Sequence, residues 1–150
     1  MPMRLRSSLP EFTGAQEWVN ANGAPERERF RGKPLLVHVW AADCAQSEAA
    51  MPHVNRWRNE YGLPVVGVHA PRAGADVGAE AAKAAIEAWG VAHPVALDAD
   101  RALARAFGSE CTPAFYLYDG NGMLRHAQTG GQGLGLLEQR IRKWSATKRF

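Results

Sequence analysis

The pattern of apolar and polar positions is clearest between residues 35 and 62. A valine-rich apolar run from Leu35 to Trp40, broken only by His38, is typical of a strand buried on both faces of a sheet. Three residues later, a helical spacing of apolar side chains begins after Cys44 and continues to Gly62. This pattern predicts a central strand that passes directly into a long helix.

The rest of the chain continues this alternation of strands and helices. A second valine-rich strand at 63–68 completes a β-α-β unit, which favours parallel pairing and a right-handed crossover. Further on, the pattern predicts a helix over 78–89, a strand over 93–98, a short helix over 100–107, a hairpin of strands 114–118 and 123–128, and a last helix with an apolar stripe from Leu134 to Trp144.

The first thirty-three residues contain several turn-forming residues around a small apolar cluster of Phe12, Trp18 and Val19. We interpret residues 1–33 as a packed N-terminal extension formed by a hairpin and a short helix. The length of the chain suits a single domain over 1–150, with a core at 34–145 and a tail at 146–150.

Composition limits the possible functions. A hydrophobic content of 46%, a charged content of 22% and a net charge of +3 are ordinary for a globular protein, and the chain carries no basic patch interleaved with aromatic residues, so we expect no nucleic-acid binding. No apolar run is long enough to insert into a membrane, and no signal peptide is recognisable. We therefore expect a cytoplasmic protein, with a periplasmic or other extracytoplasmic location as the alternative if a leader or anchor has been removed.

The two cysteines, Cys44 and Cys111, are too few for a disulfide framework, and the histidines and cysteines show no metal-binding spacing. We expect neither a metal nor another cofactor. Cys44 stands where the central strand passes into the helix. Free N–H groups and the helix dipole at that position favour a thiolate, which is the nucleophilic form of cysteine.

The sequence WAADCAQS between Trp40 and Ser47, followed by a proline eight residues after the cysteine, resembles the active site of thioredoxin-like proteins of the TlpA-like branch, and most closely the bacterial DipZ type. That resemblance covers roughly residues 10–144 and implies a thioredoxin-like α/β fold with a central mixed β-sheet flanked by helices. Relatives with a WAxWCxxC motif have a second cysteine where this chain has Ser47. Asp43 precedes Cys44, where it would either raise the pKa of the thiol or cap the helix with its side chain.

The resemblance also implies roles for residues outside this motif. Pro113 corresponds to a cis proline that faces the active-site cysteine, and Thr112 would pair its backbone with a substrate peptide beside Trp40 and Asp43. Cys111 is then either a resolving cysteine, an intermolecular disulfide partner or a buried structural residue. His38 is either a proton carrier for Cys44 or a neutral core histidine bonded to a backbone or serine partner.

These features lead to a thiol-disulfide oxidoreductase with an atypical CxxS site as the first hypothesis. Cys44 would attack a protein disulfide or a small disulfide, Ser47 would steady the thiolate, and Cys111 or an external thiol reductant would release the product. The alternatives are a binding module that holds clients by mixed disulfide or groove contacts, and a one-cysteine peroxide reductase. The protein would act as a monomer or as a disulfide-linked dimer.

Overall fold

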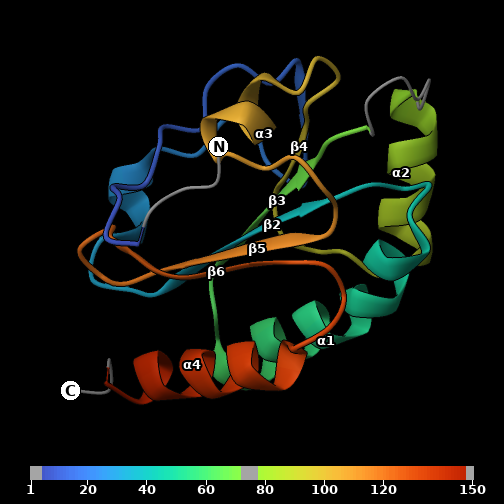
Figure 1. The fold of residues 1–150 in the computed structure, drawn as a ribbon. Helices are drawn as coiled ribbons and strands as arrows, with labels where there is room; N and C mark the ends of the chain where they lie inside the picture. The colour runs from blue at the N-terminus through green and yellow to red at the C-terminus, as the bar shows by residue number, and fades with distance from the viewer. Residues whose placement is uncertain (1–4, 72–77, 148–150) are drawn as a thin grey trace.

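A mixed sheet of six strands forms the centre of the computed structural model, which describes residues 5–71 and 78–147 (Figure 1). The strands lie in the order β1-β4-β3-β2-β5-β6. The elements follow one another as β1 (Glu17–Val19), the 3-10 helix η1 (Arg27–Phe30), β2 (Leu35–Trp40), α1 (Ala45–Tyr61), β3 (Val65–His69), α2 (Ala79–Ala88), β4 (Val95–Leu97), α3 (Ala102–Ala106), β5 (Ala114–Tyr118), β6 (Leu124–Thr129) and α4 (Leu134–Thr147).

The centre of the sheet is parallel and its flanks are antiparallel. β2 pairs in parallel with β3, and β3 in parallel with β4, whereas β5 runs antiparallel to β2 and β6 antiparallel to β5. Every residue of β2 is buried, as the apolar run predicted. The predicted β-α-β unit is therefore formed by β2, α1 and β3, with α1 as its crossover.

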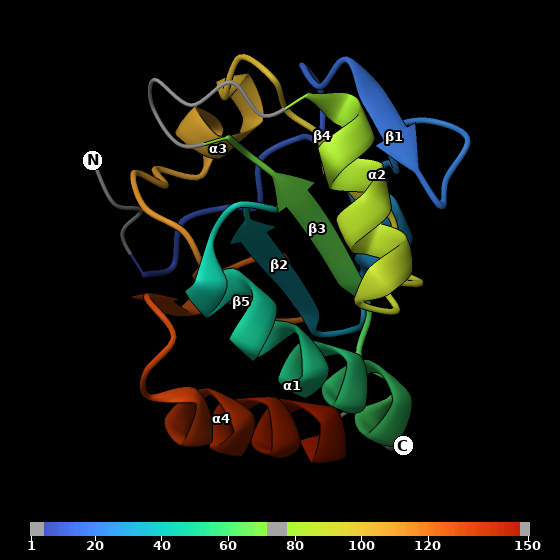
Figure 2. The ribbon, with the colours of Figure 1, turned by 90° about the vertical axis from the view of Figure 1, so that its right-hand side faces the viewer.

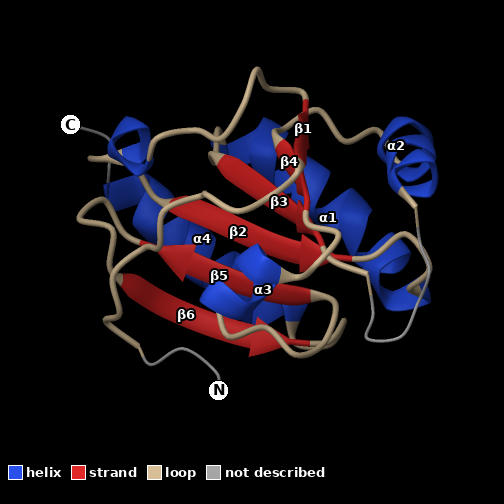
Figure 3. Ribbon diagram, turned by 90° about the horizontal axis from the view of Figure 1, so that it is seen from above, coloured by secondary structure: helices blue, strands red, loops and turns tan. Residues whose placement is uncertain are grey.

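Helices cover both faces of the sheet, which explains why β2 has no polar face. Leu36 and Trp40 pack with α1, α2 and α4 on one side; in Figure 2, α1 and α2 lie in front of the sheet and α4 lies beside α1 at the bottom of the view. Val37 and Val39 pack on the other side with α3 and the N-terminal segment, and α3 lies on this face in Figure 3. The predicted α/β architecture is confirmed.

The N-terminal extension differs from the prediction, because no hairpin forms in residues 5–33. β1 instead pairs antiparallel with β4, with Glu17 opposite Leu97, and so adds an edge strand to the sheet. The predicted short helix is the single 3-10 turn η1. Residues 1–4 lie outside the described part of the chain.

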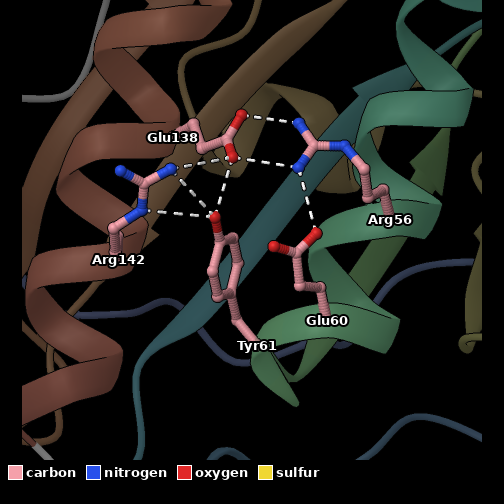
Figure 4. Close-up of polar contacts among 5 residues, drawn as sticks. All are labelled: Arg56, Glu60, Tyr61, Glu138 and Arg142. Atoms are coloured by element: carbon pink, nitrogen blue, oxygen red, sulfur yellow. Dashed lines mark hydrogen bonds and ion pairs between the residues drawn. The ribbon is translucent and has the colours of Figure 1, made fainter.

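At the other end, α4 extends to Thr147, so the first two residues of the predicted tail are helical, and residues 148–150 lie outside the described residues. A polar network joins α4 to α1 (Figure 4). The guanidinium of Arg56 donates to both carboxylate oxygens of Glu138 at 2.6 and 3.0 Å, and the Tyr61 hydroxyl donates to the same carboxylate at 2.7 Å. None of the described helices is long and apolar enough to cross a membrane.

Candidate active site

Cys44 occupies the boundary between β2 and α1. It is the N-cap residue of α1, with extended backbone angles, and its N–H donates to the Ala41 carbonyl at 3.2 Å. Only a short turn separates the end of β2 at Trp40 from the start of α1 at Ala45, and this turn places Cys44 at the start of the helix. Its side chain is partly exposed and is a free thiol.

The surroundings of the sulfur favour its ionised form. Partial burial raises the pKa of Cys44, but hydrogen bonds from the hydroxyl and backbone N–H of Ser47, with help from Thr112 and Gln46, together lower it by more. The pKa therefore lies below the ordinary value for a cysteine thiol. In its protonated form the thiol points at the Thr112 carbonyl, with the sulfur 3.6 Å from that oxygen.

Ser47 is fully buried beneath the cysteine, one turn into α1. Its Oγ accepts a hydrogen bond from the Ala41 N–H at 3.2 Å, in addition to its effect on Cys44. Ser47 thus links the turn that precedes the cysteine to the helix that follows it.

The cap expected at Asp43 is wrong, because the N-cap residue of α1 is Cys44. An upward effect of Asp43 on the pKa of Cys44 stays a prediction, since the net lowering of that pKa results from hydrogen bonds to the sulfur. The exposed Asp43 carboxylate influences His69, whose pKa it raises against the larger opposing effect of burial. Asp43 nevertheless lies at the site, because it lines the pocket in front of Cys44.

The loop before β5 faces Cys44 across this pocket. The pocket has a volume of about 560 Å³, and its walls include Cys44, Cys111 and Thr112. The Thr112–Pro113 peptide bond is cis. Cys111 is exposed and free, so the structure brings both cysteines to one pocket without a bond between them. The Thr112 hydroxyl is buried and has no partner in strict hydrogen-bond geometry among the described residues, but it lies close enough to the Cys44 sulfur to help lower the pKa of the thiol.

This combination of fold and site can be compared with known proteins. The AhpC/TSA family model matches residues 6–127. The thiol-disulfide oxidoreductase YkuV of Bacillus subtilis is 40% identical over 144 residues, which are 94% of this chain and 96% of YkuV. This chain belongs to the AhpC/TSA family.

Two further likenesses agree with this membership of the AhpC/TSA family. Protein DipZ of Mycobacterium tuberculosis is 34% identical over 142 residues, which span 91% of this chain but only 20% of DipZ. The solution structure of a thioredoxin-like protein in its oxidized form superposes with a TM-score of 0.84 at 40% identity, over 97% of this chain and 99% of that one. The predicted thioredoxin-like fold and the resemblance to DipZ are confirmed, and the chain is a homologue of thiol-disulfide oxidoreductases.

Two predicted site residues of this AhpC/TSA-family chain lie in the core instead. Trp40 is fully buried against His69 and Trp89 and does not line the pocket in front of Cys44, so its contact with substrate stays a prediction. His38 is also fully buried and stacks on Phe115 with ring centroids 4.8 Å apart. Burial lowers the pKa of His38 to about 3, which keeps the ring neutral, and neither ring nitrogen has a hydrogen-bond partner among the described residues. The structure thus gives His38 neither the proton-carrier contact nor the hydrogen-bond partner expected from the sequence.

Two residues near Cys44 were not predicted as site residues. His69, at the end of β3, accepts a hydrogen bond from the Ala42 N–H at 3.1 Å. Arg101 lines the pocket and donates to the carbonyls of Pro71 and Ser109, so it braces the loop that leads to Cys111. Neither belongs to a motif in the sequence, and only the fold brings them to Cys44. The described residues contain no cluster of side chains suited to hold a metal ion.

Proposed function

We propose that this chain is a thiol-disulfide oxidoreductase that works through Cys44 as its single nucleophile. The Cys44 thiolate attacks one sulfur of a substrate disulfide, so that a mixed disulfide forms and the other substrate sulfur leaves as a thiolate. A second thiolate then attacks Cys44 Sγ, which breaks the mixed disulfide and releases the reduced substrate. If the second thiolate is an external thiol, one more equivalent of that thiol frees Cys44 and leaves as the external disulfide. If it is Cys111, reduction of the resulting Cys44–Cys111 disulfide takes two equivalents of external monothiol, which leave as their own disulfide.

The observation that carries this proposal is the position of the Cys44 sulfur. It is partly exposed at a helix N-terminus, it has a lowered pKa, and Ser47 supports it from beneath. A substrate peptide that lies along the Thr112 backbone would bring its disulfide to this sulfur, because extended chains bind by pairing their backbone groups with an exposed edge. Thr112 O already lies 3.6 Å from the sulfur.

The resolving thiol distinguishes this site from one with two cysteines in the helix. Ser47 stands where the resolving cysteine of a CxxC site would be, and a hydroxyl cannot attack a mixed disulfide at neutral pH. Cys111 is the candidate within the chain, because it lines the same pocket. An external thiol reductant is the other candidate, and an exposed Cys111 also allows a disulfide-linked dimer.

Ser47 also supports a second function, a binding module that holds clients and releases them slowly. In that case the mixed disulfide on Cys44 is the product rather than an intermediate. The two functions differ in turnover, since both begin with the same attack by Cys44.

The first experiment treats the reduced protein with a mild disulfide oxidant and measures its intact mass without reductant. Cys111→Ser is compared with the wild type, and Cys44→Ser serves as the negative control. A monomer lighter by two hydrogens in the wild type alone would identify Cys111 as the resolving residue, and a doubled mass that disappears in Cys111→Ser would identify a dimer. An adduct on Cys44 in both proteins would assign resolution to an external thiol.

The second experiment measures turnover of a disulfide-bonded peptide with an excess of small thiol. Catalysis above the rate of the thiol alone, lost in Cys44→Ser, supports the oxidoreductase. A stoichiometric mixed disulfide on Cys44 without turnover favours the client-holding module. If Cys44→Ser reacts as fast as the wild type, both proposals are wrong.

A further inference from the structure

The turn at residues 41–44, which carries Cys44, is held by hydrogen bonds to side chains of two other elements. The Ala41 N–H donates to Ser47 Oγ at 3.2 Å, and the Ala42 N–H donates to His69 Nε2 at 3.1 Å. The first bond reaches forward into α1, and the second reaches sideways into β3. The turn is therefore fixed to two different elements, α1 and β3. Among the described residues, His69 is the one side chain of β3 that accepts a hydrogen bond from a backbone N–H group of the turn.

His69 is well held in the position from which it accepts this bond. It is 2% exposed at the carboxyl end of β3, and its Cα lies opposite that of Trp40 in the parallel register with β2. The Trp40 ring meets the imidazole edge-on, with centroids 4.9 Å apart. The backbone beside it is paired as well, because the Ala70 N–H donates to the Trp40 carbonyl at 2.9 Å and the Asp98 N–H to the His69 carbonyl at 2.9 Å.

An imidazole nitrogen accepts a hydrogen bond only when it carries no proton, so the observed contact requires neutral His69 with its proton on Nδ1. Burial favours that neutral form. Removal of the acceptor would leave the Ala42 N–H unpaired inside the protein, and the turn would have to move to find another partner.

We propose that His69 is a positioning residue for Cys44. Through the Ala42 N–H it fixes the turn that sets the sulfur at the start of α1, within reach of the Ser47 hydroxyl and N–H. This inference rests on the proposed function only in taking Cys44 as the nucleophile. Loss of the acceptor lets the sulfur move away from these donors, so the thiol becomes less acidic.

The test compares two substitutions in a Cys111→Ser background, in which Cys44 is the only thiol. His69→Gln can present a side-chain oxygen about as far from the backbone as Nε2, whereas His69→Leu fills similar space without an acceptor. The rate of alkylation by iodoacetamide is measured from pH 5 to 10 for each protein. His93→Leu is the control for loss of a buried histidine, because His93 is 3% exposed and its Nδ1 contacts Arg58 at 2.9 Å rather than the turn.

We expect His69→Leu to move the midpoint of the alkylation profile upward by about one pH unit, which slows the reaction at pH 7 roughly tenfold. His69→Gln and His93→Leu should keep the profile of the background protein. A folded His69→Leu variant with an unchanged profile overturns the proposal, as does a His69→Gln variant that shifts as far as His69→Leu.

A measurement on the unmodified protein covers the case in which His69→Leu does not fold. Nitrogen-15 NMR of the imidazole rings at pH 7 reports which nitrogen carries the proton. An unprotonated Nε2 at His69, together with a slowly exchanging Ala42 amide, supports the proposal, and a protonated Nε2 overturns it. Since alkylation and NMR do not require turnover, failure of disulfide exchange would contradict the proposed function and leave the role of His69 standing.

Discussion

Ser47 shows how one substitution changes a site at the scale of a single residue. Its hydroxyl occupies the place of the second cysteine of a CxxC site, but its contacts are those of a structural support. It accepts from the Ala41 N–H and helps to lower the pKa of Cys44. In the proposed function, the residue therefore separates activation of the nucleophile, which it retains, from resolution of the mixed disulfide, which it cannot perform.

We predict that Ser47→Ala raises the pKa of Cys44, because the hydroxyl is one of the groups that stabilise the thiolate. Alkylation of Cys44 at pH 7 should become several-fold slower, while the rate at pH 10 stays the same. The unpaired Ala41 N–H should also reduce the free energy of unfolding by about 1–3 kcal/mol. Ser145→Ala is the control, because Ser145 Oγ has no hydrogen-bond partner in the described chain. An equal effect of the two variants on alkylation would contradict the prediction.

The sequence predicted which residues lie near Cys44 more reliably than it predicted where their side chains point. The strand-to-helix boundary identified Cys44, and the relation of Ser47 and Thr112 to it followed from the motif. The buried position of Trp40 and the missing cap at Asp43 were not foreseen, for local geometric reasons. Trp40 points from β2 into the helix-covered face, and the helix starts one residue later than a cap at Asp43 requires. Such details depend on which way a side chain leaves the backbone, which residue types alone do not fix.

At the scale of elements, long apolar patterns were predicted well, and the short edge strand β1 was not. β2, α1 and β5 follow the predicted ranges closely, because each has a periodicity that its own sequence defines. β1 has three residues and is stabilised by pairing with β4, far away in the chain. Asn20, which follows it, donates to the carbonyls of Val91 and His93. These distant contacts determine the edge strand, so no local turn signal could reveal it.

The network between α1 and α4 leads to a prediction about how the last helix is held (Figure 4). Glu138 accepts from Arg56 and Tyr61, and mainly for this reason its pKa lies well below the usual range. We predict that Glu138→Gln lowers the Tm by about 2–4 °C, because a bidentate pair and a charged acceptor are lost. The effect should shrink in 1 M salt, which screens charges.

Glu60→Gln is the matched control for this experiment. Glu60 also contacts Arg56, at 3.2 Å, but its side chain is 53% exposed, against 17% for Glu138. An ion pair as exposed as that between Glu60 and Arg56 contributes little to the stability of the fold. Equal losses of Tm for the two variants, or a loss for Glu138→Gln that salt does not change, would show that the network does not fix α4.

At the scale of the whole molecule, buried histidines link the core to pH. Burial lowers the pKa of His38 to about 3. Burial, with smaller contributions from the neighbouring His38 and Arg58 side chains, lowers the pKa of His93 to about 3. An unfolded histidine has a pKa of about 6.5. Between these values the unfolded chain binds more protons than the folded one, so the folded state loses stability as the pH falls below about 6.5 and gains none from these groups above it.

We therefore predict that the free energy of unfolding decreases from pH 7 to pH 4 and that His38→Leu makes this decrease less steep. One proton bound only by the unfolded chain changes the slope of the free energy of unfolding against pH by at most about 1.4 kcal/mol per pH unit. His38→Leu should therefore reduce this slope by up to that amount. Urea denaturation at several pH values measures the slope. Because His38 makes no polar contact among the described residues, alkylation of Cys44 should keep its pH profile in the same variant. If the free energies of unfolding of the wild type and His38→Leu change in parallel with pH, His38 is not kept neutral by the core. If the alkylation profile of Cys44 shifts in the variant, His38 acts as a proton carrier for Cys44 after all.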